Sequence, residues 1–189
     1  DRYVPGGQMW VTESGDAGGG GDTRASTYLD VLRTLNELGG FSAVTDGIIF
    51  HNTLASSDYG YLKPEVFDPR PYFFAVVLWN RLMGTTVYDA AEPIREGAHV
   101  YAHSRRDGKP GKAYLVINNS MTETTTVELP GKAEIYQLTA ETPRASVMQC
   151  NGKALTLGEG YALPAMDPVA AEGTLTLPAL SCTFIVTEG

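Results

Sequence analysis

The sequence predicts an α/β unit followed by an all-β unit, and three observations support this prediction. Two short apolar runs alternate with two helical patterns between residues 8 and 84, which is the order of strand–helix units. From about residue 89 the chain consists of short segments of strand-forming residues broken by turns, without helical periodicity. A glycine run at positions 18–21 separates the first apolar run from the first helical pattern. We therefore expect two units, residues 1–88 and residues 89–189.

The first apolar run is Met9-Trp10-Val11, which is too short for a helix and rich in strand formers. Trp10 is expected to be a core residue. Glu13 follows where such a strand ends, and the four glycines begin five residues later. A loop of this composition turns tightly and lets backbone N–H groups approach a ligand.

Three interpretations of this first stretch compete on the residues alone. It is a surface loop with a solvated Glu13, a phosphate-binding loop, or a loop that holds a catalytic carboxylate beside a sugar. The phosphate interpretation is disfavoured because neither dinucleotide nor P-loop glycine spacing is present. Three carboxylates, Glu13, Asp16 and Asp22, would also repel a phosphate.

The first helix is expected after Asp22-Thr23, which can cap it, and before Gly39-Gly40, which should end it. Its apolar positions, from Tyr28 to Leu38, have helical spacing with one buried face. Residues 47–50 form a continuous apolar run that suits a parallel strand buried on both faces. Polar His51 and Asn52 come directly after this second strand.

The second helix is predicted to open at Asp68-Pro69-Arg70-Pro71, with a proline in its first turn. It runs through a strongly apolar stretch that includes Trp79, a second expected core tryptophan, and is expected to end at Gly84. Two strand–helix units are too few to close a barrel or to form a stable open sheet. The first unit is therefore expected to be part of a larger domain, and the abrupt start of the chain suggests a fragment or a processed product.

The second unit is predicted to be an antiparallel β-sandwich. Its turns carry Asp107-Gly108, Pro130-Gly131 and Asn151-Gly152, and the last of these is a strong hairpin signal. The expected strands are 98–104, 113–118, 124–129, 133–138, 146–149, 153–157, 173–177 and 183–186. Cys150 and Cys182 lie in this unit and are either a cross-sandwich pair or, as we favour, two small buried hydrophobic residues.

Composition limits the classes of function. The formal net charge of −8 argues against nucleic-acid binding through bulk electrostatics. No apolar run approaches the length of a membrane span, and no signal peptide is recognisable. The three histidines lack metal-ligand spacing with the cysteines, so no metal is expected, and no motif calls for a cofactor.

Taken together, these stretches resemble the C-terminal part of glycoside hydrolase family 79, the heparanase and β-glucuronidase family. The similarity lies in Val11-Thr12-Glu13-Ser14 with the following glycines, His51-Asn52-Thr53-Leu54 leading into Asp58-Tyr59-Gly60, Phe67-Asp68-Pro69-Arg70-Pro71, the segment 78–85, and the closing segment 177–184. It covers nearly the whole chain. The glutamate and the glycine loop are fairly specific in combination, whereas each alone would be weak.

The resemblance implies a (β/α)8 barrel followed by a β-sandwich, with residues 8–84 as the last two strand–helix units of the barrel. It implies that Glu13 is the nucleophile of a retaining glycosidase. The acid/base would be a second Glu on an earlier barrel strand, in a missing N-terminal segment of the same protein. Gly19, Gly20 and Tyr59 would bind the carboxylate of a uronic acid, and His51 and Asn52 would line the sugar site. Tyr61 is a second candidate for the tyrosine position.

This resemblance predicts a hydrolase that cleaves β-glucuronides or related uronic-acid glycans by double displacement, and that is inactive as the isolated chain. Its partners would be a carbohydrate substrate and the missing barrel segment. A secreted or periplasmic location is expected from the substrate class alone. Two alternatives remain open, a non-catalytic carbohydrate-binding or accessory β-sandwich module and a related barrel glycosidase acting on a neutral sugar.

Overall fold

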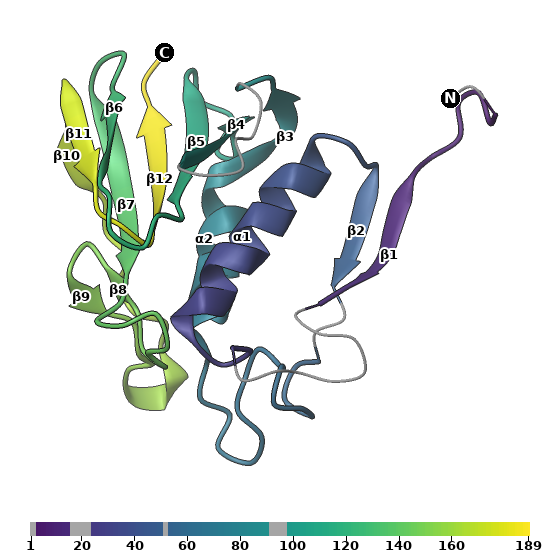
Figure 1. Ribbon diagram of the computed structural model, residues 1–189, viewed down its shortest axis with the longest axis vertical. Helices are drawn as coiled ribbons and strands as arrows, with labels where there is room; N and C mark the ends of the chain where they lie inside the picture. Colours follow the sequence, from purple (N-terminus) through teal and green to yellow (C-terminus); the bar gives the residue numbers. More distant parts are fainter. Residues whose placement is uncertain (1–2, 16–23, 51–52, 91–97) are drawn as a thin grey trace.

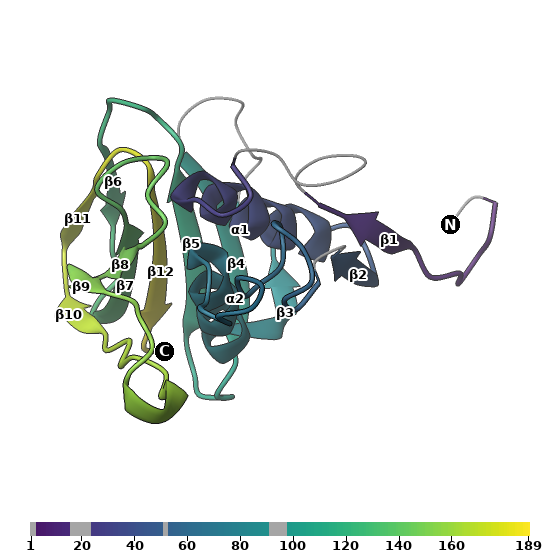
Figure 2. The same cartoon turned by 90° about the horizontal axis from the view of Figure 1, so that it is seen from below.

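The computed structural model of the chain describes residues 3–15, 24–50, 53–90 and 98–189. Two helices lie between a pair of parallel strands and a large antiparallel sheet, as Figure 1 shows. Seen from below in Figure 2, the strand pair β1 and β2 stands on one side of the helices, and the all-β part stands on the other. The chain therefore folds as an α/β part and an all-β part, as the sequence predicts.

The parallel pair consists of β1 (Trp10–Ser14) and β2 (Gly47–Phe50). The expectation that Trp10 belongs to the core is wrong, because the residue is 51% exposed. Its indole ring lies against Gly47, where an added Cβ would be 2.5 Å from ring atoms. Its Nε1 donates to Gln8 Oε1 at 3.0 Å. The Trp10 ring thus packs against the first residue of β2, while about half of Trp10 stays exposed to solvent.

The first helix, α1 (Tyr28–Ser42), differs from the expectation at both ends. It begins at Tyr28 after Thr27, later than the predicted cap at Asp22-Thr23, which lies outside the described residues. It also continues through Gly39 and Gly40 instead of stopping there. The reason at Gly39 is packing, because an added Cβ would lie 2.3 Å from the ring of Tyr101. This glycine allows the helix to approach the sheet closely.

The second helix, α2 (Pro71–Leu82), begins at the predicted proline, with Arg70 as its N-cap residue in an extended conformation. Trp79 is half-buried and packs against the main core, as expected. Gly84 does not end the helix, because the chain passes from Leu82 directly into strand β3 (Met83–Tyr88). No helix among the described segments is long and apolar enough to cross a membrane.

The large sheet has the strand order β3-β4-β5-β12-β7-β8-β9, with β10 paired to β7, and a separate two-stranded sheet joins β6 and β11. Strands β3 and β10 were not predicted, and β8 and β9 are shorter than expected. The bounds after β3 are β4 (Ala98–Arg105), β5 (Lys112–Asn118), β6 (Thr125–Glu128), β7 (Ala133–Thr139), β8 (Gln149–Cys150), β9 (Lys153–Ala154), β10 (Val169–Ala171), β11 (Thr174–Leu177) and β12 (Ser181–Thr187), with a 3-10 turn at Glu159–Tyr161. The all-β part is therefore one broad sheet covered by a small second one.

Both faces of the large sheet are buried near its centre. One face packs against the helices, in a core that joins Tyr28, Leu35 and Leu78 to Leu115 and Phe184. The other face packs under β6 and β11 in a smaller core. The buried residues of that core are Val116, Leu129, Ala133, Ile135, Leu177 and Ile185. All seven residues of β12 are buried, as expected for a central strand that lies between two layers.

Cys150 and Cys182 are both buried, and both thiols are free. Leu138 of β7 lies between them, since it is opposite Cys182 on one side and Cys150 on the other. Two strand spacings of about 4.8 Å separate the cysteines by roughly 10 Å, beyond the reach of a disulfide. Burial raises the pKa of the Cys150 thiol to about 11. The cysteines are therefore small core residues.

Candidate active site

Glu13 lies at the carboxyl end of β1, in an irregular part of the strand. Val11 is opposite Ile48 and Ser14 is opposite Phe50, so β1 has one extra residue between these two pairs. Bulges of this kind redirect a side chain and are enriched beside active sites. The arrowheads of β1 and β2 point toward the same edge in Figure 1, and Glu13 is exposed there. The carboxylate is thus at the strand end where barrel enzymes carry their chemistry.

Helix α1 anchors the residue next to Glu13. The hydroxyl of Ser14 donates to Glu37 Oε2 at 2.7 Å. Arg33 then joins two carboxylates, with Nη1 2.8 Å from Glu37 Oε2 and Nε 2.6 Å from Asp30 Oδ1. Burial alone would lower the pKa of Arg33, but the adjacent Asp30 and Glu37 raise it overall. This network ties the end of β1, next to Glu13, to helix α1.

Tyr59 lies in the loop that follows β2, and this loop is extensively hydrogen-bonded. Tyr61 N donates to Thr53 O at 2.9 Å, and Leu62 N donates to Leu54 O at 2.7 Å, so the two ends of the loop are joined. The hydroxyl of Tyr72, in the first turn of α2, donates to Tyr59 O at 2.6 Å. Tyr59 itself is half-buried. Its position is therefore fixed through its backbone.

Tyr61, the other candidate tyrosine, has the environment of a packing residue. Its ring lies 4.9 Å from the ring of Tyr72 and 6.5 Å from that of Phe73, measured between centroids. Burial raises the pKa of its phenol above the usual value, with the nearby Asp30 adding to the effect. Tyr61 thus anchors the loop on α2.

Four of the six predicted site residues, Gly19, Gly20, His51 and Asn52, lie outside the described residues. The structure describes the remaining two, Glu13 and Tyr59. Both belong to segments at the carboxyl ends of paired parallel strands, and the loop between β2 and α2 lies on that side of the pair in Figure 1. Within the described ranges, no group of three or more His, Cys, Asp or Glu side chains could hold a metal ion.

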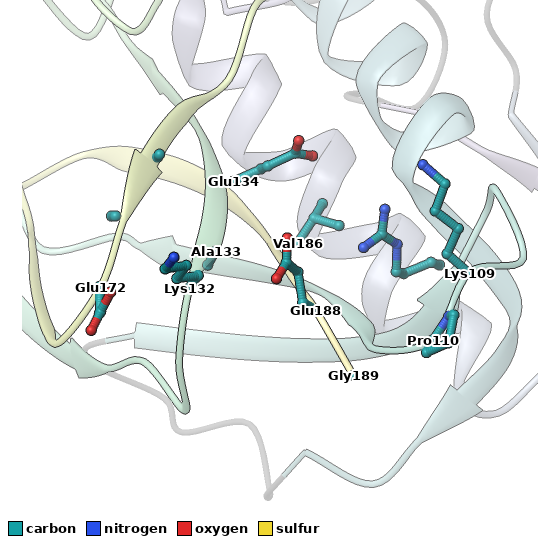
Figure 3. Close-up of a pocket in the computed structure, with 12 residues that line it drawn as sticks. Lys109, Pro110, Lys132, Ala133, Glu134, Glu172, Val186, Glu188 and Gly189 are labelled. Atoms are coloured by element: carbon teal, nitrogen blue, oxygen red, sulfur yellow. The ribbon is translucent and has the colours of Figure 1, made fainter.

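A separate cavity lies at one end of the large sheet. It is an open hollow of about 790 Å³ between the β4–β5 turn and the ends of β7, β10 and β12. Figure 3 shows Lys109 and Lys132 on its walls together with Glu134, Glu172 and Glu188. Charges of both signs line it, and neither Glu13 nor Tyr59 is among its lining residues. Its lining residues include no nucleophile paired with a general base.

Sequence reasoning missed the residues that support the site. The i, i+3 and i, i+4 spacing of Arg33 with Asp30 and Glu37 could have indicated the ion pairs on α1. Arg70 was interpreted only as part of a helix start, yet its side chain is buried and bonded to the loop that carries Tyr59. Nothing local in the sequence signals such a contact across the turn.

Comparisons with known proteins agree with this architecture. Residues 94–188 match the family model of the alpha amylase C-terminal all-beta domain. Baicalin-beta-D-glucuronidase of Scutellaria baicalensis is 28% identical over 185 residues, which is 93% of this chain and 35% of that protein. Heparanase of Gallus gallus is 29% identical over 203 residues, which is 98% of this chain and 39% of that protein. The chain thus spans little more than a third of the length of these relatives.

A solved structure shares the fold. The glycoside hydrolase family 30 subfamily 8 xylanase Xyn30A of Clostridium acetobutylicum aligns with a TM-score of 0.65 at 12% identity, covering 97% of this chain and 43% of that one. At this identity the likeness concerns the fold alone. The chain therefore belongs, through residues 94–188, to the alpha amylase C-terminal all-beta domain family, and along most of its length it resembles the C-terminal portion of glycoside hydrolase family 79, the heparanase and β-glucuronidase family.

Proposed function

We propose that this chain is the nucleophile-bearing part of a retaining glycoside hydrolase that acts on β-glucuronides or related uronic-acid glycans. The observation that carries the proposal is the position of Glu13, an exposed carboxylate in a bulge at the carboxyl end of a parallel strand. We further propose that residues 1–88 are the last part of a (β/α)8 barrel, and that residues 89–189 are its β-sandwich.

The strand pair itself supports a larger barrel. A parallel sheet normally has several strands and is covered on both faces. In the described part of the chain, β1 and β2 pair only with each other, and Met9 and Trp10 are more than half exposed. Relatives almost three times longer leave room for the remaining strands. In this proposal a preceding segment flanks β1 and carries the acid/base glutamate.

The proposed reaction has two displacements. A carboxylate oxygen of Glu13 attacks the anomeric carbon as the glycosidic C–O bond breaks, and the acid/base glutamate protonates the departing oxygen. Water then attacks the anomeric carbon and gives a proton to the same glutamate, and Glu13 leaves as a carboxylate. The two carboxyl groups of a retaining pair lie about 5–5.5 Å apart. The isolated chain would therefore lack activity, since its partner carboxyl belongs to the preceding segment.

Recognition of the uronate would come from uncharged donors. Backbone N–H groups at Gly19 and Gly20 and the hydroxyl of Tyr59 are proposed to bind the sugar carboxylate, while His51 and Asn52 contact the hydroxyl groups. The packing of Tyr61 on α2 supports Tyr59 as the ligand-binding tyrosine. An acidic protein can then bind an acidic sugar through local dipoles.

The test is the activity of the full-length protein on an aryl β-glucuronide, with Glu13→Ala and with Asp58→Asn as a matched loop carboxylate. Glu13→Ala should lower kcat by several orders of magnitude, because it removes the atom that forms the covalent bond. Asp58 is exposed, and its variant should stay within a few-fold of the parent. Full activity of Glu13→Ala would remove Glu13 from the mechanism.

The same assay separates the alternatives. A parent enzyme that cleaves an aryl β-xyloside or β-glucoside and ignores the glucuronide would be a glycosidase for neutral sugars. A folded full-length protein that cleaves none of them, yet binds glycans, would be an accessory module.

A further inference from the structure

Arg70 is a buried arginine whose side chain is directed into the loop that carries Tyr59. It precedes α2, and only 4% of it is exposed. Its Nη1 lies 2.6 Å from Gly60 O, 3.0 Å from Leu62 O and 3.2 Å from Ser57 O. These carbonyl groups lie on both sides of Tyr59 in the sequence. One guanidinium thus holds the loop backbone before and after that tyrosine.

The charge of Arg70 is not neutralised by a neighbouring carboxylate. No ion pair joins it to an acidic side chain in the ranges that the structure describes, and its buried Nε has no hydrogen-bond acceptor there. A buried cation without a counter-ion is costly, and carbonyl dipoles offset only part of this cost. An uncharged side chain would tether the loop without the penalty. Tethering alone therefore does not account for a buried charge at this position.

The loop around Arg70 is closed by hydrogen bonds and closely packed. Gly60 is buried, and an added Cβ would lie 3.0 Å from both the carbonyl oxygen and the hydroxyl of Thr53. The Thr53 and Ser57 hydroxyls are hydrogen-bonded to each other at 2.7 Å, and the Tyr72 hydroxyl donates to Tyr59 O at 2.6 Å. Such a loop presents its tyrosine in a fixed position, so that little ordering is needed on binding.

We propose that Arg70 is a positioning and specificity-determining residue for an acidic sugar. It fixes the loop that presents Tyr59, and its unneutralised charge makes the potential at this loop favourable for a carboxylate. This inference rests on the proposed function, in which Tyr59 meets the carboxylate of a uronic acid. Arg70 does not touch the substrate, and it acts through the loop backbone and through the electric field.

The test uses the full-length protein and two ligands that differ in charge, D-glucuronic acid and D-glucuronamide, as competitive inhibitors of aryl β-glucuronide cleavage. Arg70→Gln keeps a donor and removes the charge, whereas Arg70→Lys keeps the charge and loses the forked geometry. Arg70→Gln should weaken the acid about tenfold and the amide less than about threefold, as expected for a charge felt over several ångströms at intermediate dielectric. Arg70→Lys should weaken both ligands by similar factors.

A third variant separates tethering from charge. Tyr72→Phe removes the hydroxyl that holds Tyr59 O without changing any charge, and it should weaken the acid and the amide equally. Equal losses for the two ligands in Arg70→Gln, or no loss, would overturn the inference. If Arg70→Gln does not fold, a loss of preference for the acid in Arg70→Lys would overturn it, and a preserved preference would support it. An inactive parent, or an active Glu13→Ala variant, would instead refute the proposed function.

Discussion

Gly39 offers a sharp test of how α1 packs on the sheet. A glycine-to-alanine change inside a helix normally stabilises a protein by about 1 kcal/mol. At Gly39 the added Cβ would lie 2.3 to 2.5 Å from three atoms of the Tyr101 ring. Tyr101 cannot easily move away, because it is buried and its hydroxyl donates to Asn36 Oδ1 at 2.7 Å. The clash should therefore outweigh the helical gain.

The magnitude follows from three contributions. Overpacking of a close-packed site costs about 1–3 kcal/mol. Displacing the Tyr101 hydroxyl costs roughly 1 kcal/mol more, and the helix propensity returns about the same amount. We expect Gly39→Ala to lower the free energy of unfolding by about 1–3 kcal/mol, or to lower Tm by about 2–4 °C for each kcal/mol in a chain of this size.

Gly40 is the matched control. An added Cβ there would meet only the Tyr101 hydroxyl, at 3.8 Å, which is an ordinary contact. Gly40→Ala should therefore stabilise the chain by about 0.5–1 kcal/mol. Urea unfolding of both variants, followed by tryptophan fluorescence, measures the difference. Equal stabilisation by the two alanines would refute the packing of α1 against Tyr101.

Three further predictions concern buried groups. Because Cys150 and Cys182 are free and buried, a thiol reagent should label neither in the native chain and both after unfolding without reductant, whereas a hidden disulfide would leave them unlabelled. Burial lowers the pKa of His103 from its usual 6.5. As the pH drops below about 6.5, the unfolded chain therefore binds a proton before the folded chain does, and the free energy of unfolding falls. His103→Asn should lose less stability than the parent between pH 7 and 5, and an identical pH profile of the two proteins would contradict this. Tyr28→Phe removes a buried 2.7 Å hydrogen bond to Leu138 O and should lower the free energy of unfolding in urea by about 1–3 kcal/mol. An unchanged free energy of unfolding would contradict this prediction.

The alternation of elements was predictable from local patterns. Pro71 marked the start of α2, and the Asn151-Gly152 signal fell on the turn between β8 and β9, because these residues act through their own backbone preferences. The local sequence predicts helix stops at Gly39 and Gly84, whereas the structure places Gly39 inside α1 and Gly84 inside β3. Their role is set by Tyr101 and Ser104, which lie far away in the sequence, so no local pattern reveals it.

In the candidate site, too, some residues are indicated by the local sequence and others only by tertiary contacts. Glu13 could be singled out as a candidate because it follows a short apolar run and precedes a glycine loop, and its catalytic role is implied by the resemblance to the heparanase and β-glucuronidase family. The bulge that contains it depends on the register with β2, and the support from Glu37 depends on the packing of α1. Arg70 showed only its helix-capping context in the sequence, whereas its burial beneath the Tyr59 loop follows from tertiary contacts.

In the proposed function, Glu13 forms the covalent bond to the sugar. The most direct measurement is to trap the full-length protein with a 2-deoxy-2-fluoro glucuronyl fluoride, which slows hydrolysis of a glycosyl-enzyme, and to locate the label by peptide mass spectrometry. We predict one added sugar on the peptide that contains Glu13, and none in Glu13→Ala. A label on another carboxylate, or rapid cleavage without any covalent adduct, would contradict a nucleophilic role of Glu13.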